Sequence, residues 1–130
     1  MTVLVVEDDE DVRTVFTLTL RDAGFVVTEA GTCEDGLAAI ARERPALVLL
    51  DLGMPAGCMP GIEFLAQLRD APATAGMPVV IVSGLGESVN PDVTERLGVA
   101  ATLTKPVSPA LLLRVVRDAL GGRGADARPL

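Results

Sequence analysis

PALVLLDLGMP, residues 45–55, joins an apolar run to a single carboxylate. The residues from Ala46 to Leu50 are all apolar, which is typical of a strand buried on both faces in a parallel sheet. Gly53 and Pro55 end the run, so we expect Asp51 at the carboxyl end of the strand. Ligands of open α/β sheets bind at that edge. Asp51 is therefore a candidate functional residue, although an Asp after a strand also commonly caps a loop by accepting backbone N–H groups.

The size and composition of the chain exclude several classes of protein. Its 130 residues favour one domain with a large core, which must be aliphatic because the chain has only three aromatic residues. The net charge of −7 argues against a direct nucleic-acid partner, since phosphate backbones require a basic patch. The chain has no histidine, which excludes a triad or metal site that depends on one. Cys33 and Cys58 lack companion ligands, so we expect neither a disulfide nor a zinc site.

The sequence has no features of a membrane span or a secretion signal. No apolar run approaches the roughly 18 residues that a membrane span needs. Residues 1–4 lead directly into a strand pattern without a basic leader. We therefore expect a cytoplasmic protein without membrane contact.

Strand and helix patterns alternate along the chain. Besides the strand before Asp51, four apolar runs are expected to be strands: residues 2–6, 25–28, 78–82 and 99–103. Helical patterns or start signals mark five further stretches: residues 12–23, 32–41, 62–68, 90–98 and 108–119. This alternation predicts an α/β fold, a doubly wound parallel sheet of five strands with helices on both faces. Gly121 and Gly122 are expected to end the last helix, which gives one domain over residues 1–120 and a mobile tail over 121–130.

The carboxyl ends of the predicted strands collect polar side chains. Glu7 and Asp8 follow the first strand, Asp51 the third, Ser83 the fourth and Lys105 the fifth. Carboxylates that lie close together repel one another, so the cluster requires a cation. Oxygen ligands favour a hard ion such as Mg²⁺, which often bridges to a phosphate. A carboxylate can also act as a nucleophile and form an acyl phosphate.

The acidic residues next to this cluster have a structural interpretation. Asp9, Glu10 and Asp11 precede a helix, where negative charge is stabilised by the helix dipole, and Asp9 is a plausible N-cap. Taken singly, Ser83 would be a turn residue and Lys105 a solvated lysine. Their joint placement at strand ends favours the functional interpretation.

With these residues, the chain resembles the receiver domain of two-component response regulators over residues 2–120. The motifs are VED at residues 6–8 with Arg13 downstream, LDLGMP at 50–55, VSG at 82–84 and TKP at 104–106. The resemblance implies a flavodoxin-like sheet with strand order 2-1-3-4-5.

The resemblance also implies roles for the site residues. Asp51 would accept a phosphoryl group from a histidine kinase or phosphotransfer protein, and the chain would catalyse only its own phosphorylation and dephosphorylation. Asp8, Asp51 and the Gly53 backbone carbonyl would bind Mg²⁺ (with Mn²⁺ as the alternative ion), and Glu7 would act mainly through water. Ser83 and Lys105 would contact the phosphoryl group, and the Lys105–Pro106 peptide bond would be cis. Gly53 would leave the phosphoryl group open to water.

Two positions depart from the family pattern. Thr102 replaces the aromatic residue that usually moves on activation, so the usual ring movement is not available. The loop over residues 56–61 is longer than usual, which predicts a displaced loop beside the acceptor. The resemblance suggests the helix over 90–98, the strand over 99–103 and the last helix as a face for an effector or a homodimer.

Two other functions compete with this one. Asp9-Glu10-Asp11-Val12 formally fits the signature of haloacid-dehalogenase-like phosphatases, with Asp9 as nucleophile, but Asp9 lies beyond the strand and the chain has no room for a cap domain. A receiver-like scaffold that is never phosphorylated is the other alternative. The complete set of site residues argues against it.

Overall fold

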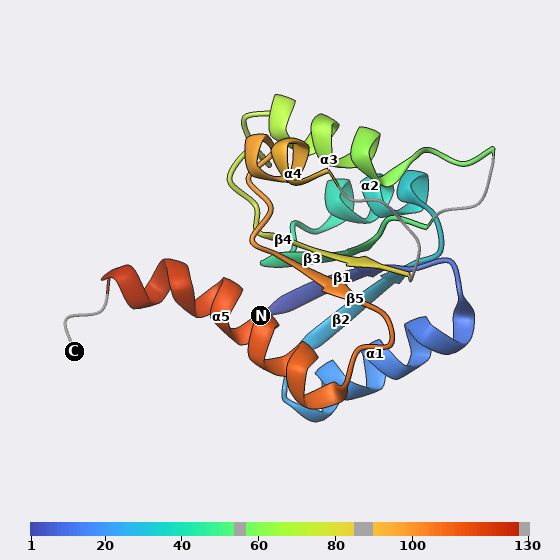
Figure 1. Cartoon of the computed structure of the whole chain (residues 1–130), viewed down its shortest axis with the longest axis vertical. Helices are drawn as coiled ribbons and strands as arrows, with labels where there is room; N and C mark the ends of the chain where they lie inside the picture. Colours follow the sequence, from blue (N-terminus) through green and yellow to red (C-terminus); the bar gives the residue numbers. More distant parts are fainter. Residues whose placement is uncertain (54–56, 85–89, 128–130) are drawn as a thin grey trace.

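The computed structural model describes residues 1–53, 57–84 and 90–127, with side chains to residue 121. Five strands alternate with five helices along the described chain (Figure 1). The strands are β1 (Thr2–Val6), β2 (Val26–Ala30), β3 (Leu47–Asp51), β4 (Val79–Ser83) and β5 (Ala101–Thr104). The helices are α1 (Glu10–Asp22), α2 (Cys33–Arg42), α3 (Gly61–Asp70), α4 (Pro91–Arg96) and α5 (Pro109–Ala127).

The strands form one parallel sheet in the order β2-β1-β3-β4-β5, which confirms the predicted fold class and strand order. The inner strands β3 and β4 are buried at every residue. Their unbroken apolar runs reflect cover on both faces. The outer strands β2 and β5 combine buried with more exposed positions because they lie at the edges. Their bounds are shifted by up to two residues from the predicted ones, 25–28 and 99–103.

Helices cover both faces of the sheet. Helices α1 and α5 lie on one face, and α2, α3 and α4 lie on the other (Figure 1). Each face has its own aliphatic core, one centred on Phe16 and Leu20 of α1 and the other on Phe64 and Leu65 of α3. The sheet is therefore held between two apolar layers, and its carboxyl edge is left to the loops.

Side-chain caps confirm the predicted starts of α1, α2, α4 and α5, whereas α3 begins after Pro60 without one. Asp9 accepts the N–H groups of Asp11 and Val12, at 2.9 and 3.1 Å. Thr32 caps α2, Asn90 caps α4 and Ser108 accepts the Leu111 N–H at the start of α5. These caps satisfy N–H groups that have no partner within the helix.

The predicted end of the last helix is wrong. Helix α5 continues through Gly121 and Gly122 to Ala127, and its end projects beyond the sheet (Figure 1). Glycine lowers helix propensity without preventing helical geometry, so the pair Gly121-Gly122 does not by itself stop a helix. By contrast, Gly24 and Gly98, which follow α1 and α4, adopt a left-handed backbone, with φ of 96° and 67°.

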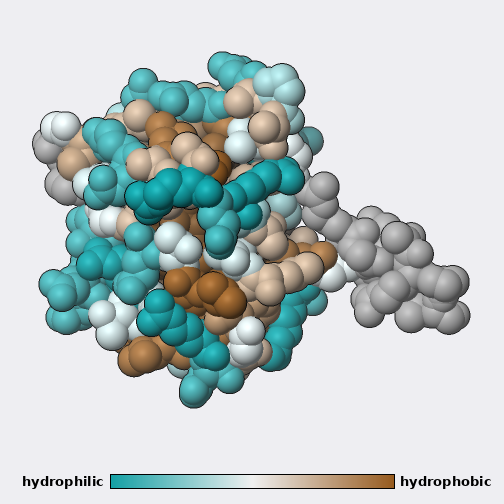
Figure 2. Space-filling model, turned by 180° about the vertical axis from the view of Figure 1, so that it is seen from behind, coloured by the Kyte–Doolittle hydropathy of each residue, from teal (hydrophilic) through white to brown (hydrophobic). Residues whose placement is uncertain are grey.

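The described surface is mainly hydrophilic on the side seen in Figure 2, with separate apolar areas. The most exposed large apolar side chains include Met1, Val15, Leu18 and Val26. Within the described residues, no helix combines the length and the apolar character needed to cross a membrane.

Candidate functional site

Four strand ends bring the predicted polar residues to the carboxyl edge of the sheet. Glu7 extends β1, since its N–H donates to the Ala30 carbonyl at 3.0 Å. Asp51 is the last residue of β3, and Ser83 is the last residue of β4. Lys105 follows β5, and its N–H donates to the Ser83 carbonyl at 2.7 Å. The regular pairing of the sheet therefore fixes where each side chain starts.

Three carboxylates form a compact cluster at this edge. One oxygen from each of Glu7, Asp8 and Asp51 lies within 4.8 Å of the others. Glu7 and Asp51 are buried, with 1% and 3% of their surface exposed, whereas Asp8 is exposed. The cluster thus has a buried floor and an open side.

Lys105 places a cation beside the two buried carboxylates. Its Nζ lies 2.8 Å from Glu7 Oε1 and 3.5 Å from Asp51 Oδ2. The side chain is 25% exposed, so the ammonium faces both the cluster and solvent. The Lys105–Pro106 peptide bond is cis, as the resemblance predicted.

Burial and proximity shift the ionisation of these groups in opposite directions. Burial, reinforced by the neighbouring Asp51, raises the pKa of Glu7 from 4.5 to about 8, despite the Lys105 ammonium. Burial also acts to raise the pKa of Asp51. Bonds from Glu7 and the Gly53 N–H, with the influence of Asp8 and Lys105, outweigh it and lower that pKa. These shifts favour a protonated Glu7 beside an ionised Asp51 near neutral pH.

Asp51 is at once a loop cap and a member of the cluster. Its Oδ1 accepts the Gly53 N–H at 2.9 Å, which is the turn contact expected for an Asp after a strand. Its Oδ2 faces Lys105. The two interpretations of Asp51 are therefore compatible, because one oxygen serves the turn and the other remains within the cluster.

The donor set fits a hard divalent cation. The cluster offers carboxylate oxygens at short mutual distances, with one side open to solvent for water ligands. Mg²⁺ prefers a few carboxylates and retains several waters. A divalent ion would also favour loss of the proton that Glu7 otherwise holds. Gly53 follows the cluster directly in the loop after β3, where its carbonyl was predicted to be a ligand.

Asp9 lies in a different environment from the cluster. Its carboxylate is occupied by the two N–H groups at the start of α1. Neither it nor Glu10 or Asp11 belongs to the carboxylate group formed by the described residues. The N-cap interpretation of Asp9 is confirmed, and its use as a phosphatase nucleophile has no support in this geometry.

Two departures from the family pattern have different outcomes. Thr102 is exposed on β5, in line with a side chain that has no ring to bury. Met54, Pro55 and Ala56 lie outside the described residues, so the predicted displacement of this loop stays a prediction. The described part of the loop contacts α2, since the Met59 N–H lies 3.3 and 3.4 Å from the Glu34 carboxylate oxygens.

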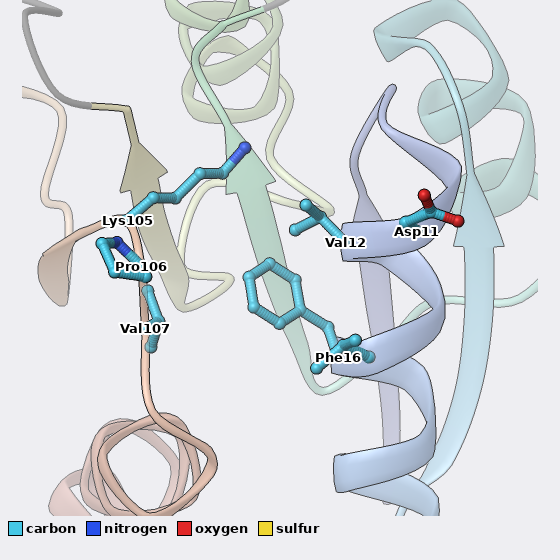
Figure 3. A pocket seen from close by; sticks show the side chains of 7 residues that line it. Asp11, Val12, Phe16, Lys105, Pro106 and Val107 are labelled. Atoms are coloured by element: carbon cyan, nitrogen blue, oxygen red, sulfur yellow. The ribbon is translucent and has the colours of Figure 1, made fainter.

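Sequence reasoning missed an apolar groove beside Lys105. The groove has a volume of about 500 Å³ and lies between α1 and the segment after β5. Figure 3 shows the Phe16 ring entering it from α1, opposite Pro106 and Val107, while Asp11 points away from Lys105. No sequence pattern could reveal it, because its walls come from distant parts of the chain.

Comparisons with known proteins agree with this architecture. Residues 3–117 match the family model described as the response regulator receiver domain. An uncharacterized 14.6 kDa protein of Leptolyngbya boryana is 33% identical over 118 residues, which cover 91% of this chain and 88% of that protein. The KDP operon transcriptional regulatory protein KdpE of Escherichia coli K12 is 35% identical over 127 residues. That match covers 98% of this chain but 54% of KdpE, so the chain spans about half the length of that regulator.

Solved structures show the same fold. A CheY-like receiver domain protein from Methanospirillum hungatei JF-1 has a TM-score of 0.85 and 29% identity, with 96% of this chain and 97% of that chain covered. Chemotaxis response regulator CheY4 of Vibrio cholerae has a TM-score of 0.82 and 27% identity, with 92% and 98% covered. The chain therefore belongs to the response regulator receiver domain family of two-component systems.

Proposed function

We propose that Asp51 accepts a phosphoryl group from a phosphohistidine on a partner histidine kinase or phosphotransfer protein, in a Mg²⁺-dependent reaction that changes partner interactions. The observation that supports this most is the cluster of Glu7, Asp8 and Asp51 with the Lys105 ammonium on its edge. Acidic side chains packed this closely beside a cation, with two of them buried and shifted in pKa, are typical of functional sites.

The transfer step uses the Asp51 carboxylate as nucleophile. An Asp51 oxygen forms a bond to phosphorus while the bond from phosphorus to the donor imidazole nitrogen breaks, and its electron pair remains on the imidazole. The lowered pKa of Asp51 keeps the carboxylate ionised and ready to attack. The product is a mixed anhydride on Asp51.

The neighbouring residues stabilise charge during this step. Mg²⁺, when bound, supplies positive charge to the phosphoryl oxygens, as phosphoryl transfer requires. Asp8 and Asp51 would bind it directly with the Gly53 carbonyl, Glu7 would act mainly through water, and Mn²⁺ could replace it. The Lys105 ammonium starts 3.5 Å from Asp51 Oδ2 and would pair with a phosphoryl oxygen. The Ser83 hydroxyl would donate to another oxygen.

Water then reverses the modification. It would attack phosphorus, release inorganic phosphate and restore the Asp51 carboxylate. Gly53 presents no side chain beside the acceptor, so this approach is open from its side. The chain thus catalyses only its own phosphorylation and dephosphorylation and has no external metabolite as substrate.

Partner binding involves surfaces next to the site. The apolar groove that contains Phe16 adjoins Lys105, so a phosphodonor protein that reaches Asp51 would cover it. The face of α4, β5 and α5 remains our proposal for effector or homodimer contacts, and α4 is well suited because none of its residues is buried. The relatives KdpE and MtrA are named as transcriptional or DNA-binding regulators. For this acidic chain, we propose no direct contact with nucleic acid.

Borohydride trapping tests the assignment. The protein is incubated with Mg²⁺ and acetyl phosphate, reduced with borohydride and mapped by mass spectrometry. We expect modification at Asp51, and none in Asp51→Asn or after Mg²⁺ is removed with EDTA. Asp9→Asn is the control and should be modified like the wild type. Label on Asp9 would support a phosphatase, and no label from acetyl phosphate or a kinase would support the scaffold alternative.

A further inference from the structure

We propose that Arg13 is a positioning residue that holds the turn of Glu7 and Asp8 in the geometry needed for metal binding. This proposal rests on the proposed function, because it concerns the Mg²⁺ site of the phosphoryl-transfer reaction. Among the described hydrogen bonds and ion pairs, none joins Arg13 to a carboxylate of the cluster. Arg13 instead donates to the backbone carbonyl of Glu7.

Arg13 joins three elements at the carboxyl edge. The pairing of β1 and β2 ends at Val6 and Ala30, so the Glu7 carbonyl lies beyond the last strand pair. Arg13 Nη1 donates to that carbonyl at 2.8 Å, and Arg13 Nε donates to Glu29 Oε1 on β2 at 3.3 Å. One guanidinium on α1 therefore ties the end of β1 to the end of β2.

The other contacts of Glu7 show why this bond matters. The Glu7 N–H continues the sheet, Oε2 lies 3.2 Å from the Asp9 N–H and Oε1 faces Lys105. The contacts of the carboxylate belong to the turn or to the cluster itself. The Arg13 bond comes from outside both, so it can fix where the turn lies. Without it, the turn could shift and spread the three carboxylates.

The geometry requires an arginine. Its planar fork presents donors in different directions and can hold a carbonyl and a carboxylate together, whereas a lysine has a single ammonium. Gly31 lies beside the fork, and a Cβ at that position would be in van der Waals contact with Arg13 Nη1, at 3.4 Å. The side chain is 21% exposed, so the bond to the Glu7 carbonyl is partly shielded from water.

The direction in which Mg²⁺ affinity changes on replacing Arg13 separates a positioning role from an effect of its charge. Removing a nearby positive charge should by itself strengthen binding of a cation. Loss of positioning should weaken it, and loss of partners outside the first ligand shell typically costs 10-fold to 100-fold in metal affinity. A weaker site in Arg13→Ala would therefore not follow from charge.

The test measures the Mg²⁺ dissociation constant by titration calorimetry, with the melting temperature in EDTA as a second readout. We expect Arg13→Ala to bind Mg²⁺ about 10-fold more weakly. Its phosphorylation rate should recover at saturating Mg²⁺. Arg13→Lys, which keeps the charge and serves if Arg13→Ala fails to fold, should bind Mg²⁺ more weakly than the wild type.

Arg21→Ala is the matched control. Arg21 lies on the same helix, and its Nη2 donates to the Val27 carbonyl on β2 at 3.2 Å, away from the cluster. It should lose stability but keep the wild-type Mg²⁺ affinity. Unchanged or tighter Mg²⁺ binding in both Arg13 variants would overturn the proposal, as would equal weakening in Arg21→Ala. If the wild type neither binds Mg²⁺ nor accepts a phosphoryl group, the proposed function itself fails.

Discussion

Two cationic side chains, Lys105 and Arg69, are partly buried in very different surroundings. Lys105 lies at the carboxyl edge of the sheet, against the buried carboxylates of Glu7 and Asp51. Arg69 lies near the end of α3 and donates to backbone carbonyls in the segments after α4 and before β4. One cation faces groups that titrate and can bind a ligand. The described hydrogen bonds of the other go to backbone carbonyls, which do not titrate.

The contacts of Arg69 join three parts of the chain. Its Nε donates to the Leu97 carbonyl at 2.6 Å, and Nη2 donates to the Gly98 carbonyl at 3.3 Å, just after α4. Its Nη1 donates to the Met77 carbonyl at 2.8 Å and to the Ala75 carbonyl at 3.1 Å, before β4. These carbonyls lie in the segments between elements, outside the hydrogen bonding within helices and strands.

The comparison separates stability from function. A guanidinium bonded to several fixed carbonyls stabilises one arrangement of the chain. An ammonium between buried carboxylates stabilises a site that would be unfavourable without it and that can exchange its partners. We therefore expect substitutions at the two positions to affect different measurements.

The largest expected effect concerns phosphorylation. Lys105→Met removes the ammonium but keeps an unbranched side chain. Because preorganised charge stabilises the transition state, the phosphorylation rate should fall about 10²-fold. Arg69→Ala should leave the rate within about twofold of the wild type, since Arg69 contacts none of the cluster residues in the described contacts. Rates of Asp51 modification by acetyl phosphate at saturating Mg²⁺ measure both. Similar losses in the two variants would break the comparison.

The second effect is on stability, where the substitution of Arg69 should cost more than the substitution of Lys105. Arg69→Ala should lower the free energy of unfolding by about 2–3 kcal/mol, since several partly buried carbonyls lose a charged donor. Lys105→Met should cost less than about 1 kcal/mol near pH 6, because the proton on Glu7 compensates for the lost cation. Urea unfolding in EDTA measures both values. Arg69→Lys should recover part of the loss, and a larger cost for Lys105→Met than for Arg69→Ala would contradict this order.

The third prediction concerns pH. In the unfolded chain Glu7 ionises near 4.5, whereas in the folded protein its pKa is about 8. Between these values the folded protein holds a proton that the unfolded chain has released, so the free energy of unfolding should fall as pH rises from about 4.5 to about 8. Glu7→Gln should remove most of this fall. The exposed Glu63→Gln serves as control and should keep it.

Melting temperatures from pH 5 to 8.5 in EDTA test the pH prediction. Saturating Mg²⁺ should oppose the fall in the wild type, because the ion competes with the proton on Glu7 and binds only the folded cluster. A wild-type melting temperature that rises over this range in EDTA would show that Glu7 is ionised throughout. The lowered pKa of Asp51 acts only at acid pH, where stability should be lost as pH falls below its usual value.

Local sequence patterns predicted most of the fold, and they named the three carboxylates and the lysine that the structure brings together, while the roles of these residues stay predictions. The apolar run before Asp51 and the cap at Asp9 were clear because each depends on neighbouring residues. The end of α5 was not predictable, since Gly121-Gly122 is compatible with both a stop and a continued helix. The sequence also could not predict the bond from Arg13 to Glu7 or the carbonyl contacts of Arg69. They join residues whose proximity depends on the assembled sheet.

The smallest expected effect comes from Gly61→Ala. This substitution changes the packing beside Asp51 and leaves the charges of the cluster as they are. A Cβ on Gly61 would lie 2.7 Å from Leu52 Cδ2 and 3.4 Å from the Asp51 carbonyl oxygen. In Gly61→Ala the flexible end of Leu52 should move, and the better helix propensity of alanine should offset part of the cost. We expect a melting-temperature change of less than about 4 °C. The Mg²⁺ affinity and phosphorylation rate should remain near wild type, because the side chains of the cluster are untouched. A strong loss of Mg²⁺ affinity would mean that the site depends on the backbone position of Asp51 as closely as on its charges.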